Sequence, residues 1–142
     1  MTKEEQSIEG ILRFIEVADP DNRGALDEIN GLVHYYLNPH ERRIKVVQDL
    51  GTGPRLCMKG EDSYYVFTPF ATSRNALKKI RPNWLEFKGI YRMAHGYHAD
   101  FVGMGSEFRS SIQETEELAE LACVLQAIEY GRTHKLGCES KI

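Results

Sequence analysis

Two histidines and an aspartate lie within six residues and form the part of the chain best equipped for chemistry. The segment reads His95-Gly96-Tyr97-His98-Ala99-Asp100. An imidazole beside a carboxylate can act as an acid/base pair, and both groups are common metal ligands. Alternate side chains of an extended segment share a face, so we expect His98 and Asp100 to lie together and His95 to point away.

These three residues are therefore possible acid/base or metal-binding residues. A catalytic zinc needs three protein ligands in a fixed geometry, and no ligand beyond His95, His98 and Asp100 can be named. We expect that the two histidines do not share a metal. The simpler alternative is one buried, hydrogen-bonded histidine beside an exposed one.

A short basic segment is the second candidate site. Arg74, Lys78 and Arg81 recur at spacings of four and three, which places them on one face of a helix. Ser73 can cap this helix, and Trp84 follows it. A cationic helix face near a helix N-terminus can bind an anion. The sequence predicts a ligand-binding set of five residues: Ser73, Arg74, Lys78, Arg81 and Trp84. The alternative is an ordinary solvated helix face.

Composition limits the function classes. The chain has 142 residues, of which 42% are hydrophobic and 27% charged, and its formal net charge is -3. A chain of this length can bury a core without metal or disulfide support. A slightly acidic protein has no overall attraction to nucleic acid or acidic membranes, so we do not expect a nucleic-acid partner. Any anion binding must be local.

The cysteines and the apolar runs bear on location. Cys57, Cys123 and Cys138 are an odd number without a C-x-x-C pair, which favours a reducing compartment. The first residues lack the apolar region of a signal peptide, and no apolar run approaches the ~20 residues of a membrane span. The sequence predicts a soluble cytoplasmic protein.

No cofactor motif is complete. The loop that begins at Asp19 has the outline of a calcium loop, but Arg23 stands at its fifth position and Asn30 at its twelfth. The turn at 51–54 lacks the lysine and the following helix of a P-loop. We therefore expect no cofactor and no metal, and we expect Asp21 or Asn22 to cap the next helix.

Hydrophobic periodicity predicts the elements that position these residues. Apolar residues at helical spacing predict an antiparallel helical hairpin over 1–38, whose first helix begins at Thr2. Alternating residues predict an antiparallel sheet over 42–104, which contains the short basic helix at 73–81. The expected strands are 43–48, 55–59 and 64–67, with a fourth at 90–94.

The longest predicted helix covers 105–132, with Ser106 as its cap. Its apolar stripe consists of Phe108, Ile112, Leu118, Leu121, Ala122, Leu125 and Ile128. A sheet of four short strands would cover about half of this stripe, and soluble monomers seldom expose such a patch. The sequence therefore predicts a homodimer through this helix. Residues 133–142 are expected to form a polar tail with Cys138 exposed.

Together these elements predict one α+β domain over 1–142. It has an antiparallel three- or four-stranded sheet, an N-terminal helical hairpin and a long C-terminal helix.

Residues 55–130 resemble the middle of class 3 lipases. The resemblance rests on the strand Y-Y-V-F at 64–67, the T-S-R-N-A-L segment at 72–77, the A-H-G-Y-H-A-D-F segment at 94–101 and the helix after it. In that family the helix leads to a nucleophile elbow, G-x-S-x-G. This chain contains no such motif, so the resemblance implies a non-catalytic relative.

These observations leave three function classes. The leading one is a non-enzymatic binding or regulatory protein that docks an anionic ligand or an acidic partner surface on the basic segment. The second is a hydrolase-like or metal-dependent enzyme that uses His95, His98 and Asp100. The third is a structural assembly subunit.

Overall fold

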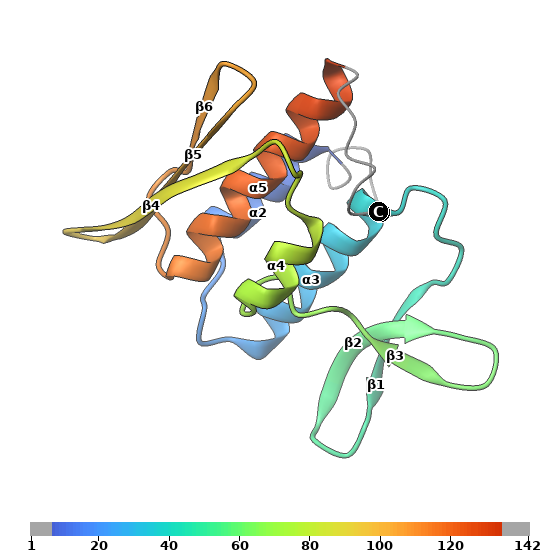
Figure 1. The fold of residues 1–142 in the computed structure, drawn as a ribbon. Helices are drawn as coiled ribbons and strands as arrows, with labels where there is room; N and C mark the ends of the chain where they lie inside the picture. The colour runs from blue at the N-terminus through green and yellow to red at the C-terminus, as the bar shows by residue number, and fades with distance from the viewer. Residues whose placement is uncertain (1–6, 135–142) are drawn as a thin grey trace. The chain divides into compact units, whose positions relative to one another are not determined.

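A computed structural model describes residues 7–134 of the chain. Contacts within the chain group it into two compact units, divided between Pro69 and Phe70, and each unit is described by itself. The described residues form four helices and two antiparallel three-stranded sheets (Figure 1). The predicted α+β class, with an N-terminal helical hairpin and a long C-terminal helix, is confirmed. The strands, however, form two sheets rather than one.

The helical hairpin opens the first unit. Helix α2 covers Ile8–Val17, and α3 covers Arg23–Leu37. The Ser7 hydroxyl accepts a hydrogen bond from the Gly10 amide, and the Asn22 side chain accepts one from the Ala25 amide, so both helices have N-caps. The two helices pack together and bury apolar residues from both. The predicted start at Thr2 lies outside the described residues.

The first sheet follows the hairpin. Its strands are β1 (Lys45–Asp49), β2 (Pro54–Lys59) and β3 (Tyr64–Val66), paired antiparallel in the order β1-β2-β3. This order confirms the predicted meander. Strand β2 packs on α3, and Arg55 donates two hydrogen bonds of 2.8 Å to the buried Asp27 carboxylate. A bidentate pair of this kind fixes the strand relative to the helix.

The second unit begins with α4 (Arg74–Ile80), which is capped by Ser73 as predicted. Strands β4 (Glu86–Met93), β5 (Gly96–Gly103) and β6 (Ser106–Arg109) pair antiparallel in the order β4-β5-β6 (Figure 1). A β-bulge interrupts the β4–β5 register between Phe87 and Gly89. One face of this sheet is buried, because Ala99, Phe101 and Phe108 have almost no exposed surface.

The last helix, α5, covers Glu116–Thr133, so the predicted start at 105 is wrong. Residues 106–109 form β6 instead. Met104 and Gly105 both have positive φ, 52° and 74°, which is the geometry of a two-residue hairpin turn. The true N-cap is Thr115, whose hydroxyl accepts a hydrogen bond from the Leu118 amide. Two alternating runs around a short turn outweigh the helical spacing of Phe108 and Ile112.

Helix α5 is buried on every side over its central turns. All eight residues from Leu118 to Leu125 are buried, including Leu121 and Leu125 at 0% exposure. The expectation that half of an apolar stripe would remain exposed is therefore wrong, because α5 packs against α4 and against strands β4, β5 and β6. With that stripe covered, α5 has no half-exposed apolar face that would support the predicted homodimer. Cys138 and the predicted tail after His134 lie outside the described residues.

None of the helices between residues 7 and 134 is both long enough and apolar enough to cross a membrane.

Candidate functional sites

The second sheet brings two of the predicted chemical residues together. His98 lies opposite Tyr91 on β4, and Asp100 lies opposite Arg109 on β6. His98 and Asp100 share the face that does not carry the buried Phe101, and His98 Nε2 is 3.8 Å from Asp100 Oδ1. His95 occupies the two-residue turn between β4 and β5, away from this pair.

Asp100 forms its main interaction with Arg109. The guanidinium donates from Nε to Oδ1 at 2.8 Å and from Nη2 to Oδ2 at 3.2 Å. These hydrogen bonds hold the pKa of Asp100 below its ordinary value, although partial burial acts in the opposite direction. The 3.8 Å separation from His98 is too long for a hydrogen bond. The carboxylate therefore hydrogen-bonds to Arg109, and the His98 imidazole lies within ion-pair distance of it without a hydrogen bond.

Arg109 was not among the residues singled out from the sequence. The signal that could have identified it is the alternation in S-E-F-R at 106–109, which places Glu107 and Arg109 on one face of a strand. Within the described part of the chain, no three His, Cys, Asp or Glu side chains are grouped closely enough to hold a metal ion. The face of His98 and Asp100 also carries Glu107, but these three groups are not close enough together to hold a metal ion.

The basic helix does not present its cations as one free set. Arg74 donates from Nε to the buried Oε1 of Glu120 at 2.7 Å, and its Nη1 lies 3.7 Å from Glu116 Oε1. The Arg81 guanidinium lies over the Phe101 ring at 5.8 Å. Lys78 is exposed and has no hydrogen bond or ion pair with the described residues. Lys78 and Arg81 are thus the cations of this set that pair with no carboxylate of the described residues.

Trp84 packs within the second unit and is partly exposed. Its ring packs against Phe108 and Tyr130, at centroid distances of 6.0 and 6.2 Å. Gly103 makes room for the ring, because a Cβ there would lie 2.7 Å from Trp84 Cε3. The indole Nε1 is buried and has no hydrogen-bond partner among residues 7–134. The ring therefore packs against two aromatic side chains of its own unit.

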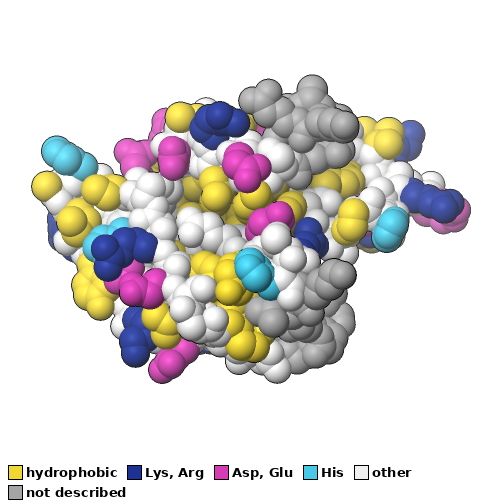
Figure 2. Space-filling view, turned by 90° about the horizontal axis from the view of Figure 1, so that it is seen from above, with side chains coloured by type: hydrophobic (Ala, Val, Ile, Leu, Met, Phe, Trp, Pro, Cys, Tyr) yellow, Lys and Arg dark blue, Asp and Glu magenta, His cyan; other side chains and the backbone are white. Residues whose placement is uncertain are grey.

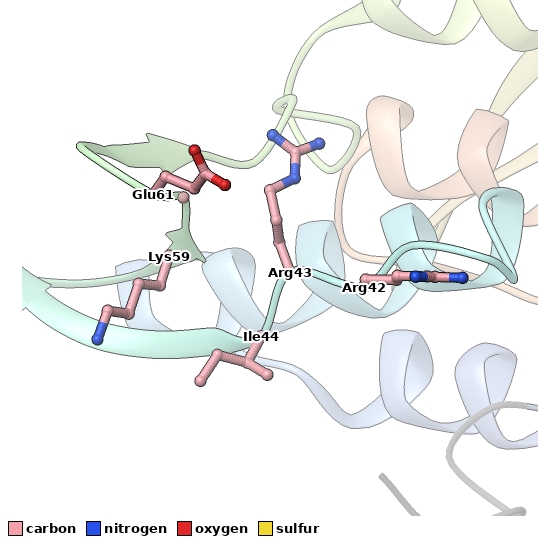
Figure 3. Close-up of a pocket in the computed structure, with 6 residues that line it drawn as sticks. Arg42, Arg43, Ile44, Lys59 and Glu61 are labelled. Carbon is pink, nitrogen blue, oxygen red and sulfur yellow. The ribbon is translucent and has the colours of Figure 1, made fainter.

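The first sheet carries a different basic region at the end where β1 begins. A hollow of about 350 Å³ is lined by Arg42, Arg43, Ile44, Lys59, Gly60 and Glu61. Figure 3 shows that Arg43 and Glu61 extend to one side of the strands and that Ile44 and Lys59 extend to the other, while Arg42 points away from both pairs. The three basic side chains diverge, so they do not converge on one point.

Arg43 is held in place by a local network. Glu41 accepts hydrogen bonds from Arg43 Nε and Nη2, at 2.9 and 2.8 Å, and its Oε1 lies 2.9 Å from His34 Nε2. The Arg43 hydrogen bonds, followed by that of His34, hold the pKa of Glu41 well below its ordinary range. The same guanidinium lies 5.5 Å from the centre of the Tyr65 ring. Arg43 thus links the segment before β1 to the edge strand β3.

Exposed apolar side chains are concentrated around the same sheet. Six of the twelve large hydrophobic residues that are exposed between residues 7 and 134 lie on β1, β3 or their flanks: Ile44, Val47, Leu50, Tyr64, Tyr65 and Val66. All three residues of β3 are exposed. Strand periodicity identified the Tyr64 strand, but it could not show that both faces of an edge strand reach solvent.

Charge is otherwise mixed over the surface. The face shown in Figure 2 carries basic and acidic side chains interspersed with apolar ones. The mixture of charges agrees with the small net charge of -3. The face in that view is not dominated by charges of one sign.

Comparison with known proteins places the chain in no group: no protein-family model, curated protein or solved structure matches it. The resemblance to class 3 lipases therefore gains no support from a relative. The function must be inferred from the surfaces described above.

Proposed function

We propose that the protein is a non-enzymatic binding protein that docks an acidic surface of a partner protein on its first sheet. The docking area, which we name the β1–β3 surface, consists of Arg42, Ile44, Lys59, Tyr64, Tyr65 and Val66. It wraps around the exposed edge strand β3, because Tyr64 and Val66 lie on the face of Lys59 and Tyr65 lies on the opposite face. The observation that carries the proposal is the concentration of exposed apolar and aromatic side chains beside basic ones on this one sheet. Exposed apolar patches with a polar rim are typical of protein interaction sites.

The residue types support a protein partner. Tyrosine and arginine are enriched at protein interfaces, whereas lysine and the acidic residues are depleted at their centre, so Lys59 would lie at the rim. Arg42 and Lys59 form no hydrogen bond or ion pair with the described part of the chain, so their charges are available to a partner. Because the basic side chains diverge (Figure 3), they are suited to acids spread over a surface rather than to one small anion.

The other function classes have weaker support. An anion site on α4 would have to compete with Glu120 for Arg74. An acid/base site at His98 would lack a hydrogen bond from the imidazole to Asp100. A homodimer through α5 is not part of the proposal, because α5 is buried within the chain. We also propose a cytoplasmic location, which is supported by the free, buried thiols of Cys57 and Cys123.

Site-specific photo-crosslinking tests the proposal. A photoreactive phenylalanine analogue at Tyr65 should form a covalent adduct with a partner in cells, and mass spectrometry should identify that partner. The purified partner is then measured against the wild-type protein and against the charge-reversed variant Arg42→Glu/Lys59→Glu. We expect that variant to bind at least about tenfold more weakly and to lose much of the salt dependence of binding.

The matched control is Lys78→Glu/Lys79→Glu, which reverses two exposed charges on α4 and should bind like the wild type. Equal affinities of the wild type and the variant Arg42→Glu/Lys59→Glu would refute the proposal. A partner surface without an excess of acidic residues would refute it as well.

A further inference from the structure

The second sheet carries a hollow on its solvent face that the proposed docking does not use. The hollow measures about 290 Å³ and is lined by Lys88, Tyr91, Asp100, Phe101, Val102, Glu107, Phe108 and Arg109. It lies within the second unit, whereas the β1–β3 surface belongs to the first. Its lining combines charged groups of both signs with an exposed aromatic ring.

On the β4 side, the hollow has a cation that pairs with no group of the described residues. The β-bulge between Phe87 and Gly89 adds Lys88 to the strand without a partner residue in the register. Bulges redirect side chains and are frequent beside binding sites. Lys88 is exposed, and no hydrogen bond or ion pair joins it to any residue between 7 and 134. Its ammonium group is therefore free to bind a carboxylate.

An aromatic ring forms one wall. Gly89 lies opposite Asp100 and contributes no side chain, and a Cβ at Gly89 would be 2.9 Å from the Tyr91 hydroxyl. The phenol therefore lies over Gly89, in the space that a side chain would fill. The Tyr91 ring packs on the His98 ring at 5.2 Å with a tilt of 32°, and 47% of the residue remains exposed. Backed by the imidazole, it is a suitable surface for an apolar or aromatic ligand group.

On the β6 side, a fixed cation stands next to a carboxylate. Asp100 engages Nε and Nη2 of Arg109, so Nη1 has no bond within the described residues and the side chain is 66% exposed. Glu107 lies two residues before Arg109, on the same face of the strand. The hollow thus offers Lys88 and Arg109 to a ligand carboxylate and Glu107 to a ligand ammonium group.

The charge balance and the volume define the ligand. Two cations and two carboxylates line the hollow, so a ligand with separated charges but no net charge fits it better than a simple anion. At about 30 Å³ per water molecule, the volume corresponds to about ten waters, or a ligand of similar atom count. We infer that this hollow binds a small zwitterion, an α-amino acid with an aromatic or apolar side chain.

Titration with three related compounds tests the inference on the full chain. L-phenylalanine carries both charges, phenylacetate lacks the ammonium group, and phenethylamine lacks the carboxylate. Amide chemical shifts in ¹⁵N–¹H spectra should move on β4, β5 and β6 in a saturable way with phenylalanine, with a dissociation constant of roughly 0.1 to 5 mM for so small a ligand. Each truncated compound should bind at least about tenfold more weakly, because one charged contact is lost.

Substitutions assign the two charges. Lys88→Gln should weaken phenylalanine binding about tenfold, whereas Lys79→Gln on α4 should leave it unchanged. Glu107→Gln should weaken phenylalanine binding and reduce the preference for phenylalanine over phenylacetate. The inference fails if phenylalanine produces no saturable shifts up to about 20 mM, which corresponds to negligible affinity. It also fails if all three compounds bind equally. The variant Arg42→Glu/Lys59→Glu should bind phenylalanine normally, so failure here and failure of the proposed partner docking are separate results.

Discussion

The ion pair between Arg74 and Glu120 ties α4 to α5, and its removal should weaken the second unit. Glu120 is 2% exposed and accepts the Arg74 Nε hydrogen bond at 2.7 Å. Arg74→Met would leave a buried carboxylate without its cation. Removal of one partner from a buried pair typically costs about 3 to 5 kcal/mol, and the 41% exposure of the Arg74 side chain places the expected loss near the lower end, about 3 kcal/mol.

Two controls separate this pair from ordinary surface charge effects. Glu116→Gln removes the other carboxylate near Arg74, which lies at 3.7 Å and is 46% exposed, so the expected loss is at most about 0.5 kcal/mol. In the double variant Arg74→Met/Glu120→Met, neither charge of this pair remains. Its free energy of unfolding should return to within about 1 kcal/mol of the wild-type value.

Urea unfolding followed by the fluorescence of Trp84 provides the measurement. Trp84 is the single tryptophan of the chain and lies in the second unit, so its signal reports on the unit that contains the pair. The reasoning is refuted if Arg74→Met costs no more than Glu116→Gln. It is also refuted if the double variant is as unstable as the single variant Arg74→Met.

Three further predictions concern single residues. The Arg43 hydrogen bonds lower the pKa of Glu41, so the stabilisation by this carboxylate is fully present above its unfolded pKa of about 4.3 and is lost as the pH falls below that value. Glu41→Gln should therefore lower the free energy of unfolding by about 2 kcal/mol at pH 7. Acid titration of both proteins should show that this difference shrinks as the pH falls. Both Gly96 and Gly105 have positive φ, so alanine is strained at either position, but a Cβ at Gly96 would also lie 2.1 Å from the Gln113 carbonyl oxygen, whereas a Cβ at Gly105 would meet no atom within 4 Å. Gly96→Ala should therefore lower the thermal midpoint far more than Gly105→Ala, and equal midpoints would contradict this. Burial raises the pKa of the Cys123 thiol to about 12, so the reactive thiolate is scarce in the native protein. In a variant whose other cysteines are replaced by serine, Cys123 should react with a disulfide reagent at least about a hundredfold more slowly in the native state than in the unfolded state.

Local signals in the sequence predicted a large part of the fold. Caps and helical spacing identified α3 and α4, and the Ser73 cap has its predicted hydrogen bond to the Ala76 amide. Alternation identified the three strands of the first sheet in their correct order. Alternation also placed His98 and Asp100 on one face. Each of these features depends on residues that are close together in the chain.

Features that depend on distant residues were not predictable in the same way. The separation into two sheets depends on which strands pair, and periodicity does not specify pairing. The burial of Glu120 has its explanation in Arg74, which lies 46 positions away. Residues 106–109 alternate as in a strand, but this pattern covers only four residues. The helical spacing of apolar residues extended over the longer range 105–132, so the sequence predicted a helix where the structure has β6. Arg109 was missed as a site residue for the same reason.

The position of α5 in the chain also has a consequence for biosynthesis. The ribosome has synthesised the apolar residues of the second sheet by Phe108, but the helix that covers them, α5, is complete only at Thr133. Proteins emerge from the ribosome N-terminus first, and a sheet with an uncovered apolar face is prone to aggregation. We therefore expect the first unit to be able to fold during synthesis, whereas the second must wait for its last helix. A nascent chain stalled before Glu116 should bind chaperones through the second sheet and release them when α5 is supplied.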